Sequence, residues 1–373
     1  MACTQYKLFF ADQIATPAQL NGFETITVHQ EMDMNWTAHL EFPLRTNAQG
    51  DWTGEAESYL QPDVRVRIEV RVMSGAYVPL IDGSLVTADY DTHKDPGQSM
   101  LRIDVQDDGY LLHRDETVHL YPGITDDVIA QQIFDDSPDI DSTDIDPVDA
   151  PADLSNNVTV LRGTQMELLQ TLARRQEMHA FVLPGSQPHT SIGCFKSDPG
   201  PDEDSGLEPM VLLGSGRNLM NLKLSSASGL PAVYNTSNVS LGDLSVNSST
   251  ANLDDISRLG TNPPGGIPVK RFLRPGKSWN VALGRATQGA SEQAAYALSA
   301  DGEVLKDTYP DVLSPYRNVA VLGSNGKLSG MWLIRQVTHT VTRNSYGQTF
   351  SLQRNAQSAG TGNSAPAVPK SVF

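Results

Sequence analysis

The alternation of residues 64–72 constrains the fold more than any other feature of the sequence. Valine or isoleucine occupies every second position of this stretch, and arginine or glutamate occupies the positions between. Because successive side chains of a β-strand point to opposite faces, this period of two predicts a strand with one face in an apolar core. Shorter strands are expected at 78–80 and 84–87, broken at Asp82-Gly83, and another at 100–105. The first hundred residues are therefore predicted to be β structure.

Residues 106–210 predict a mixed α+β domain. Helices are expected over 125–134, with a threonine at the N-cap, and over 164–178, where a Thr-x-x-Glu capping box stands at the start. The segment between them, 135–153, holds eight aspartates and no lysine or arginine. We expect a solvated loop there. Calcium binding is the alternative, although the glycine and the terminal glutamate of an EF-hand loop are missing.

The last hundred residues return to β structure. A short alanine-rich helix over 291–299 is expected to end at Asp301-Gly302. A hairpin is expected around the turn residues 344–347. The predicted strands of this part and of the segment before it cover 211–234, 319–322, 331–342 and 348–354.

Two of these β segments share a short pattern. In the first, Val86-Thr87 precedes Gly97-Gln98 across a turn, and in the second, Val337-Thr338 precedes Gly347-Gln348 at a spacing one residue shorter. Chance similarity between two amphipathic hairpins is one explanation. A true repeat would place a related β domain near each end of the chain.

Composition and motifs argue against several functional classes. A net charge of −17 disfavours binding to nucleic-acid phosphates or to anionic lipid. No apolar run is long enough to span a membrane, and no signal-peptide pattern opens the chain, so we expect synthesis and assembly in the cytoplasm. Cys3 and Cys194 lack the partners of a thiolate metal site, and the eight histidines form no HExxH motif. No phosphate loop, dinucleotide loop or nucleophile elbow is complete. We therefore expect a protein that is not an enzyme and binds no cofactor or metal.

The C-terminal hairpin carries a family motif. A strand that begins at Gly330 ends in Val-Thr-His339, a turn with Tyr346 follows, and the next strand ends in Arg354-Asn355. This order resembles the closing motif of the late-control D proteins, the baseplate hub proteins of contractile phage tails, and it is similar to the hub part of VgrG proteins of type VI secretion systems. The resemblance covers roughly residues 5–357. Further segments that fit the family pattern in order are 79–87, 104–114, 160–175 and 313–317.

The resemblance implies a fold and a division into domains. The fold would be β-rich α+β, with two tail-tube-like antiparallel β-barrel domains and additional α/β segments. The implied parts are a tube-like domain over 1–105, completed by about 211–240, an α+β domain over 106–210, a linker over 241–268, a second tube-like domain over 269–357 and a flexible tail over 358–373.

The resemblance also implies a structural role. The chain would form a homotrimer that adapts a six-fold tail tube to a three-fold central spike and encloses a channel lined by acidic or neutral residues. Its partners would be the tail tube protein, the spike, baseplate wedge proteins and a tape-measure protein in the channel, with no membrane and no sequence-specific nucleic acid. Because the chain ends about 16 residues after the motif, we expect the spike to be a separate protein. The particle would be a virion tail baseplate or an injection particle, assembled in the bacterial cytoplasm.

Contact residues are expected in two places. The charged side of the strand over 64–72 would meet a neighbouring subunit or else face solvent. The final hairpin and the tail after Ala356 would face the spike. The candidate interface residues are Arg65, Arg67, Glu69, Arg71, Trp332, His339, Tyr346, Arg354 and Asn355. A glycan-binding tail-fibre or adhesin-type β protein is the alternative function, and a polysaccharide hydrolase is a third class.

Overall fold

The N-terminal β half, β1 to β7, is an antiparallel sheet that curls around one apolar core. The computed structural model describes residues 5–46, 52, 58–95, 97–148, 158–227, 232–239, 245–251, 257–262, 269–272, 287, 290–291, 295–306, 308–323, 327–343 and 345–358. The strands of this half are β1 (Gln5–Phe10), β2 (Gln13–Ile14), β3 (Thr25–Glu31), β4 (Thr37–Pro43), β5 (Arg65–Arg71), β6 (Val78–Asp91) and β7 (Met100–Asp107), and a short helix, α1 (Pro17–Leu20), precedes β3. The predicted strands over 64–72 and 100–105 are confirmed as β5 and β7.

The break expected at Asp82-Gly83 is wrong, because β6 runs through it as one strand of 14 residues. Gly83 marks a close approach of two strands instead of a turn. A Cβ atom at Gly83 would lie 1.9 Å from the carbonyl oxygen of Gln106 on β7. Glycine is required there because only a residue without a side chain lets the neighbouring backbone come so near.

The middle domain, residues 108–198, forms its own core between two small sheets and two helices. A 3₁₀ helix (Asp108–His113) leads into it. Its elements are β8 (Glu116–Pro122), α2 (Asp126–Asp135), β9 (Ser142–Ile145), β10 (Val158–Thr164), α3 (Gln165–Gln176), β11 (Met178–Pro184) and β12 (Ser191–Ser197). Strands β8 and β10 pair with each other, and β11, β12 and β9 form the second sheet.

The capping of the two helices matches the sequence only in part. The capping box of α3 is confirmed, since Thr164 and Glu167 bond to each other's backbone N–H groups. Thr125 occupies the N-cap of α2, but its side chain makes no capping bond. The expected acidic loop also contains a strand, because β9 pairs in parallel with β12.

The C-terminal β half surrounds a third core. Its strands are β13 (Met210–Val211), β14 (Leu219–Ser226), β18 (Leu298–Val304), β19 (Asn318–Leu322), β20 (Gly330–Thr342) and β21 (Tyr346–Arg354). β13 pairs with β19 and β14 with β18, so these strands belong to this half and do not complete the N-terminal one. The backbone N–H of Asn218, just before β14, donates to the carbonyl of Val211 in β13 at 2.9 Å, so this bond links the end of β13 to the start of β14.

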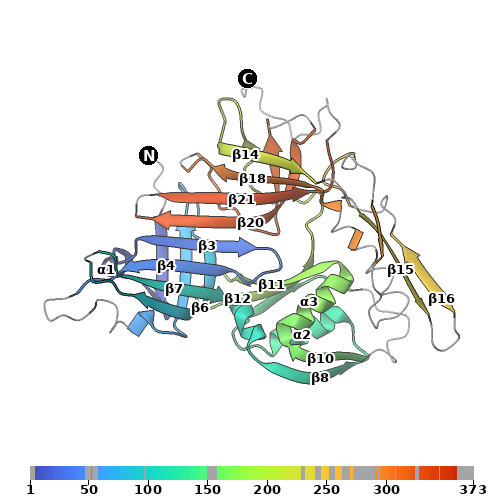
Figure 1. The fold of residues 1–373 in the computed structure, drawn as a ribbon, viewed down its shortest axis with the longest axis horizontal. Coiled ribbons are helices and arrows are strands. Elements are labelled where there is room, and N and C mark those ends of the chain that lie inside the picture. Colours follow the sequence, from blue (N-terminus) through green and yellow to red (C-terminus); the bar gives the residue numbers. More distant parts are fainter. Residues whose placement is uncertain are drawn as a thin grey trace.

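The two β halves share one sheet. Residues 330–333 of β20 pair with β19, whereas residues 336–342 pair with β3, so β20 belongs to both halves. Figure 1 shows the resulting stack from β14 through β21, β20 and β3 to β6, and the described strands of this sheet number 13. The long strands of the sequence repeat, β6 and β20, each pair with the next strand of their half and each contain a bulge. The hairpin expected around 344–347 is confirmed as β20–β21.

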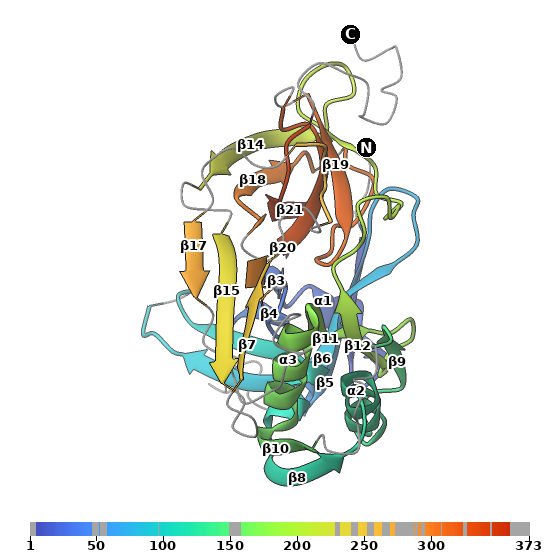
Figure 2. The same ribbon diagram turned by 90° about the vertical axis from the view of Figure 1, so that its right-hand side faces the viewer.

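The remaining strands form a separate three-stranded sheet, which we call the arm. It consists of β15 (Ala232–Val239), β16 (Val246–Thr250) and β17 (Val269–Phe272), with β15 in the centre. Figure 2 shows the arm beside the rest of the chain. The expected linker over 241–268 therefore contains β16. The expected helix over 291–299 lies partly outside the described residues, and its end is wrong because β18 begins at Leu298 and includes Asp301-Gly302.

Candidate functional site

The charged side chains of β5 are buried within the chain. Arg65, Arg67 and Glu69 are between 2% and 9% exposed, so they do not form the free face that we expected. Asp82 on β6 connects the two arginines. Its carboxylate accepts from Arg65 Nε at 2.8 Å and from Arg67 Nη1 at 2.9 Å. Arg67 Nε also donates to Glu69 at 2.8 Å. We call Arg65, Arg67, Glu69, Asp82 and Asp108 the ion network.

The ion network joins the N-terminal β half to the middle domain. Arg67 donates to the carbonyl oxygens of Gly185 and Gln187, both at 2.9 Å. Arg65 donates two hydrogen bonds to the carboxylate of Asp108, at 2.9 and 2.6 Å. Burial would lower the pKa of Arg65, but its bonds to Asp108 and Asp82 outweigh burial and raise that pKa. The ion network is therefore a contact between the N-terminal β half and the middle domain of the same chain.

Arg71 differs from the other three charged residues of β5. It is half-buried, it donates to the side-chain oxygen of Gln5, and its guanidinium lies 5.0 Å from the ring centre of Tyr77. Lys7 Nζ lies 3.9 Å from the same ring centre. Arg71 thus belongs to a small cation–aromatic group where β1 pairs with β5.

A second polar junction, around His179 of β11, brings together residues from the N-terminal half, the middle domain and the C-terminal half. His179 Nδ1 lies 2.7 Å from Asp33 of the N-terminal half, and Nε2 lies 3.0 Å from Asp198. Tyr316, from the C-terminal half, accepts the backbone N–H of Asp33 at 2.7 Å and stacks on Phe181 with ring centres 3.7 Å apart. Burial disfavours the imidazolium form, but the bonds to Asp198 and Asp33 outweigh it and raise the pKa of His179 to about 10.

The C-terminal motif residues form an internal clamp. Trp332, Arg354 and Asn355 are all less than 4% exposed. Arg354 donates to the carbonyl oxygens of Leu259 at 2.8 Å and Leu328 at 3.1 Å, and Trp332 Nε1 donates to Leu328 at 2.9 Å. Burial lowers the pKa of Arg354 to about 10. These residues tie residues 257–259 and 328–329 to the end of β21, and their place inside the chain corrects the expectation that they face the spike.

The remaining motif residues lie where the two β halves meet. His339 is fully buried, with Nδ1 2.8 Å from the hydroxyl of Tyr346 and Nε2 3.1 Å from Oε1 of Gln30 on β3. Gln30 Nε2 donates to Leu80 O, so its Oε1 must accept, which assigns the ring proton to His339 Nε2. Burial lowers the pKa of His339 to about 3 and keeps the ring neutral. His339 and Tyr346 are thus internal contacts too.

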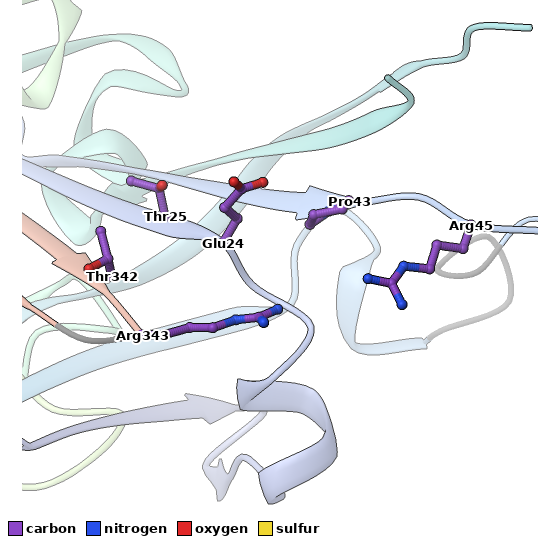
Figure 3. Close-up of a pocket in the computed structure, with 6 residues that line it drawn as sticks. All are labelled: Glu24, Thr25, Pro43, Arg45, Thr342 and Arg343. Carbon is purple, nitrogen blue, oxygen red and sulfur yellow. The ribbon is translucent and has the colours of Figure 1, made fainter. Parts of the chain in front are cut away.

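One open cavity of about 420 Å³ lies at the same seam between the two halves. Figure 3 shows its lining, which is Glu24, Thr25, Pro43, Arg45, Thr342 and Arg343. Arg343 donates to the carbonyl oxygens of Asn21 at 2.7 Å and Phe23 at 3.5 Å. Glu24 is the only acid among the lining residues, and no nucleophile with a paired base accompanies it, so the lining does not make a catalytic constellation.

Among the described residues, no group of three or more His, Cys, Asp or Glu side chains could hold a metal ion. Cys194 is buried, and burial raises the pKa of its thiol to about 12, so the thiolate that reacts or binds metals is disfavoured. No helix in the described part of the chain is long and apolar enough to cross a membrane.

Sequence reasoning missed the residues that join the domains. Asp82 stood in a predicted break between two strands, and His179 has no charged partner close to it in sequence. The partners of His179 are 146 and 19 positions away. A polar residue inside an otherwise apolar stretch, such as His179 in the strand over 178–184, was the one available signal.

The fold is that of phage tail proteins and of VgrG-related proteins of type VI secretion. No family model and no curated protein sequence matches the chain. A tail protein from Neisseria meningitidis superposes with a TM-score of 0.62 at 11% identity, covering 94% of this chain and 96% of that one. The 43 kDa tail protein of prophage MuSo2 from Shewanella oneidensis gives 0.60 at 13% identity, covering 95% and 100%. An E. coli component of the type VI secretion system, which has structural similarity to T4 phage tail proteins, gives 0.53 at 11% identity, covering 94% and 77%.

Proposed function

We propose that the chain is the hub of a contractile tail or of a related injection particle. In this proposal three copies form a ring that adapts a six-fold tail tube to a three-fold spike and encloses a channel. The observation that carries it is the pair of mainly antiparallel β halves, each around its own core, in one chain. The likeness of the fold to tail proteins along nearly the whole length supports it.

The symmetry of such an assembly explains why one chain would carry two β halves. A six-fold ring and a three-fold ring cannot share one set of identical contacts. Three chains with two similar β halves each present six similar surfaces on one side and three identical ones on the other. In this proposal the N- and C-terminal β halves are the two tube-like domains. The equivalent places of β6 and β20 in the two halves support that assignment.

The proposed partners follow from the role. The hub would contact the tail tube protein on one side and a spike on the other, baseplate wedge proteins around its rim, and a tape-measure protein in the channel. This is the role of the late-control D proteins and of the hub part of VgrG. The chain would act by binding alone, as a component of a virion or injection particle that is assembled in the bacterial cytoplasm.

The mass of the purified protein in solution tests the proposal. Light scattering coupled to size exclusion should give three times the chain mass of 40.4 kDa. A single-chain mass at all accessible concentrations, or a stable even-numbered oligomer, would refute the trimeric hub. A single-chain mass together with binding to a glycan array would favour the alternative, a glycan-binding β protein.

A further inference from the structure

The contact between the N-terminal β half and the middle domain, which we call the joint, is built from buried carboxylates. The two parts have separate hydrophobic cores, and the ion network crosses between them. The backbone N–H of His189, in the turn between β11 and β12, donates to the carboxylate of Asp82 at 3.0 Å. The hydroxyl of Ser191 donates to Asp108 at 2.5 Å. The middle domain is thus held through the oxygens of acidic side chains.

A further acid, Asp107, lies at the end of β7, directly before Asp108. It is 4% exposed. Its two oxygens accept backbone N–H groups, from Trp36 at 2.6 Å and from Gly109 at 3.0 Å. Within the part of the chain that the structure describes, no cation bonds to Asp107. Asp107 is therefore a buried carboxyl whose partners are neutral.

The buried carboxyls of the joint outnumber its buried cations. Six side chains, each at most 9% exposed, are the carboxyls of Glu69, Asp82, Asp107 and Asp108 and the guanidiniums of Arg65 and Arg67. With all six ionised, the joint would bury an excess of negative charge. Burial and neighbouring like charges both disfavour ionised carboxyls, so this arrangement favours one acid that keeps its proton.

The surrounding elements do not supply the missing positive charge. His179 on β11 lies between Asp33 and Asp198, and His189 lies 3.0 Å from Asp12. Each of these histidines therefore has acids of its own. The other titratable side chains on the elements packed around the 3₁₀ helix are those of Tyr110, His113, Glu167, Arg174, Arg175, Cys194 and Tyr316.

We infer that the joint closes with a proton bound to its buried carboxyls and loosens when that proton is lost. This inference goes beyond the proposed function and does not rest on it. Asp107 is the main site of the proton, because each of the other three acids bonds to Arg65 or Arg67. Burial raises the pKa of Asp107 to about 8 against its two backbone bonds, and the charge of Asp108 acts in the same direction as burial.

The direction of the pH dependence follows from the proton count. In an opened joint, water reaches Asp107 and its pKa returns to the ordinary value of about 3.9. Between about pH 4 and pH 8 the closed joint therefore holds one more proton than the opened joint, so the closed joint weakens as the pH rises. A difference of one proton corresponds to about tenfold per pH unit. Opening should become about a hundredfold more frequent from pH 5 to pH 7.

Native-state hydrogen exchange in the full-length protein, corrected for the intrinsic pH dependence of exchange, tests this inference. The reporting amides are those of Trp36, Gly109 and His189, because they donate to Asp107 and Asp82. In wild type their opening constants should rise about a hundredfold between pH 5 and pH 7. Asp107→Asn should remove most of this rise, because asparagine carries no proton that can be lost.

Two control variants separate Asp107 from other titrating groups. Asp104→Asn changes the same strand at a side chain that is 40% exposed and bonded to His39, and it should keep the full rise. His189→Gln removes the exposed pair with Asp12 and should keep most of the rise. Infrared difference spectroscopy gives a second readout: wild type at pH 6 should show the carbonyl band of a protonated carboxylic acid, and Asp107→Asn should lack it.

The outcomes are distinct from those of the hub proposal. Wild-type opening constants that stay the same between pH 5 and pH 7 would overturn the inference, and so would a rise that Asp107→Asn keeps in full. If Asp107→Asn does not fold, the infrared band of wild type decides, and its absence at pH 6 would overturn the inference. A protein that never exceeds one chain mass would refute the trimeric hub and leave the joint as described.

Discussion

Replacing Arg67 should loosen the joint between the N-terminal β half and the middle domain. Arg67 is 2% exposed, and it donates to Glu69, Asp82 and the carbonyl oxygens of Gly185 and Gln187. Arg67→Met keeps most of the side-chain volume but leaves the buried Glu69 without its cation. Breaking a buried ion pair by removing one partner costs about 3–5 kcal/mol.

An exposed arginine on another strand provides the control for Arg67→Met. Arg102 on β7 has a side chain 54% exposed and pairs with Asp91 at 3.4 Å, and an exposed pair contributes at most about 1 kcal/mol. Arg102→Met should therefore change little. Because the chain has separate cores and need not unfold in one step, native-state hydrogen exchange is the suitable assay.

The expected result is local. At about 1.4 kcal/mol per factor of ten, amides of β5 and of the segment around 185–190 should exchange about a hundred- to several-thousand-fold faster in Arg67→Met than in wild type. Exchange in β20 and β21 should change far less. If Arg67→Met speeds exchange no more than Arg102→Met does, the ion network is not what joins the two parts.

Two further substitutions test other features. His179 has a pKa raised to about 10 against an ordinary value of about 6.5, so its stabilising contribution is complete below pH 6.5 and is lost as the pH rises toward 10. The difference in opening free energy of the β11 amides between wild type and His179→Gln, measured by native-state hydrogen exchange, should shrink across that range, and a constant difference would contradict the ion pairing. Gly83→Ala should lower the opening free energy of the β6 and β7 amides by about 1–3 kcal/mol in the same assay because its Cβ would meet the Gln106 carbonyl, whereas Gly200→Ala, with no atom within 4 Å of the added Cβ, should be nearly neutral. Equal effects of the two alanines would refute the close approach.

Local patterns predicted local structure well. The alternation over 64–72 gave β5, and the capping box of Thr164 gave the start of α3, because both signals depend only on residues close in sequence. The hairpin β20–β21 was predictable for the same reason. Elements of this kind are set by the period of the apolar residues and by turn chemistry.

Long-range packing was not predictable from the same patterns. The alternation over 64–72 shows that one face of β5 is charged, but it does not show that the segment around residues 185–189 covers that face. The pairing of β20 with β3 joins residues about 300 positions apart. Gly83 was assigned to a turn, because the sequence alone does not distinguish a glycine that permits a turn from a glycine that permits two strands to pack closely.

The same ambiguity affected the candidate interface residues. Charged and aromatic residues in a family motif are compatible with a partner surface and with an internal clamp. Arg354 and Trp332 proved to be a clamp because their partners are backbone carbonyls of residues 259 and 328. The exposed apolar side chains of β8, β10 and the arm became visible only in three dimensions.

The central claim is that one chain supplies two similar β halves to a ring. Electron cryomicroscopy of the assembled ring tests it most directly, by counting chains and β domains around the channel. The proposal predicts three chains whose N- and C-terminal β halves alternate as six similar domains around that channel. Six chains, or a ring in which only one β half of each chain faces the channel, would contradict it.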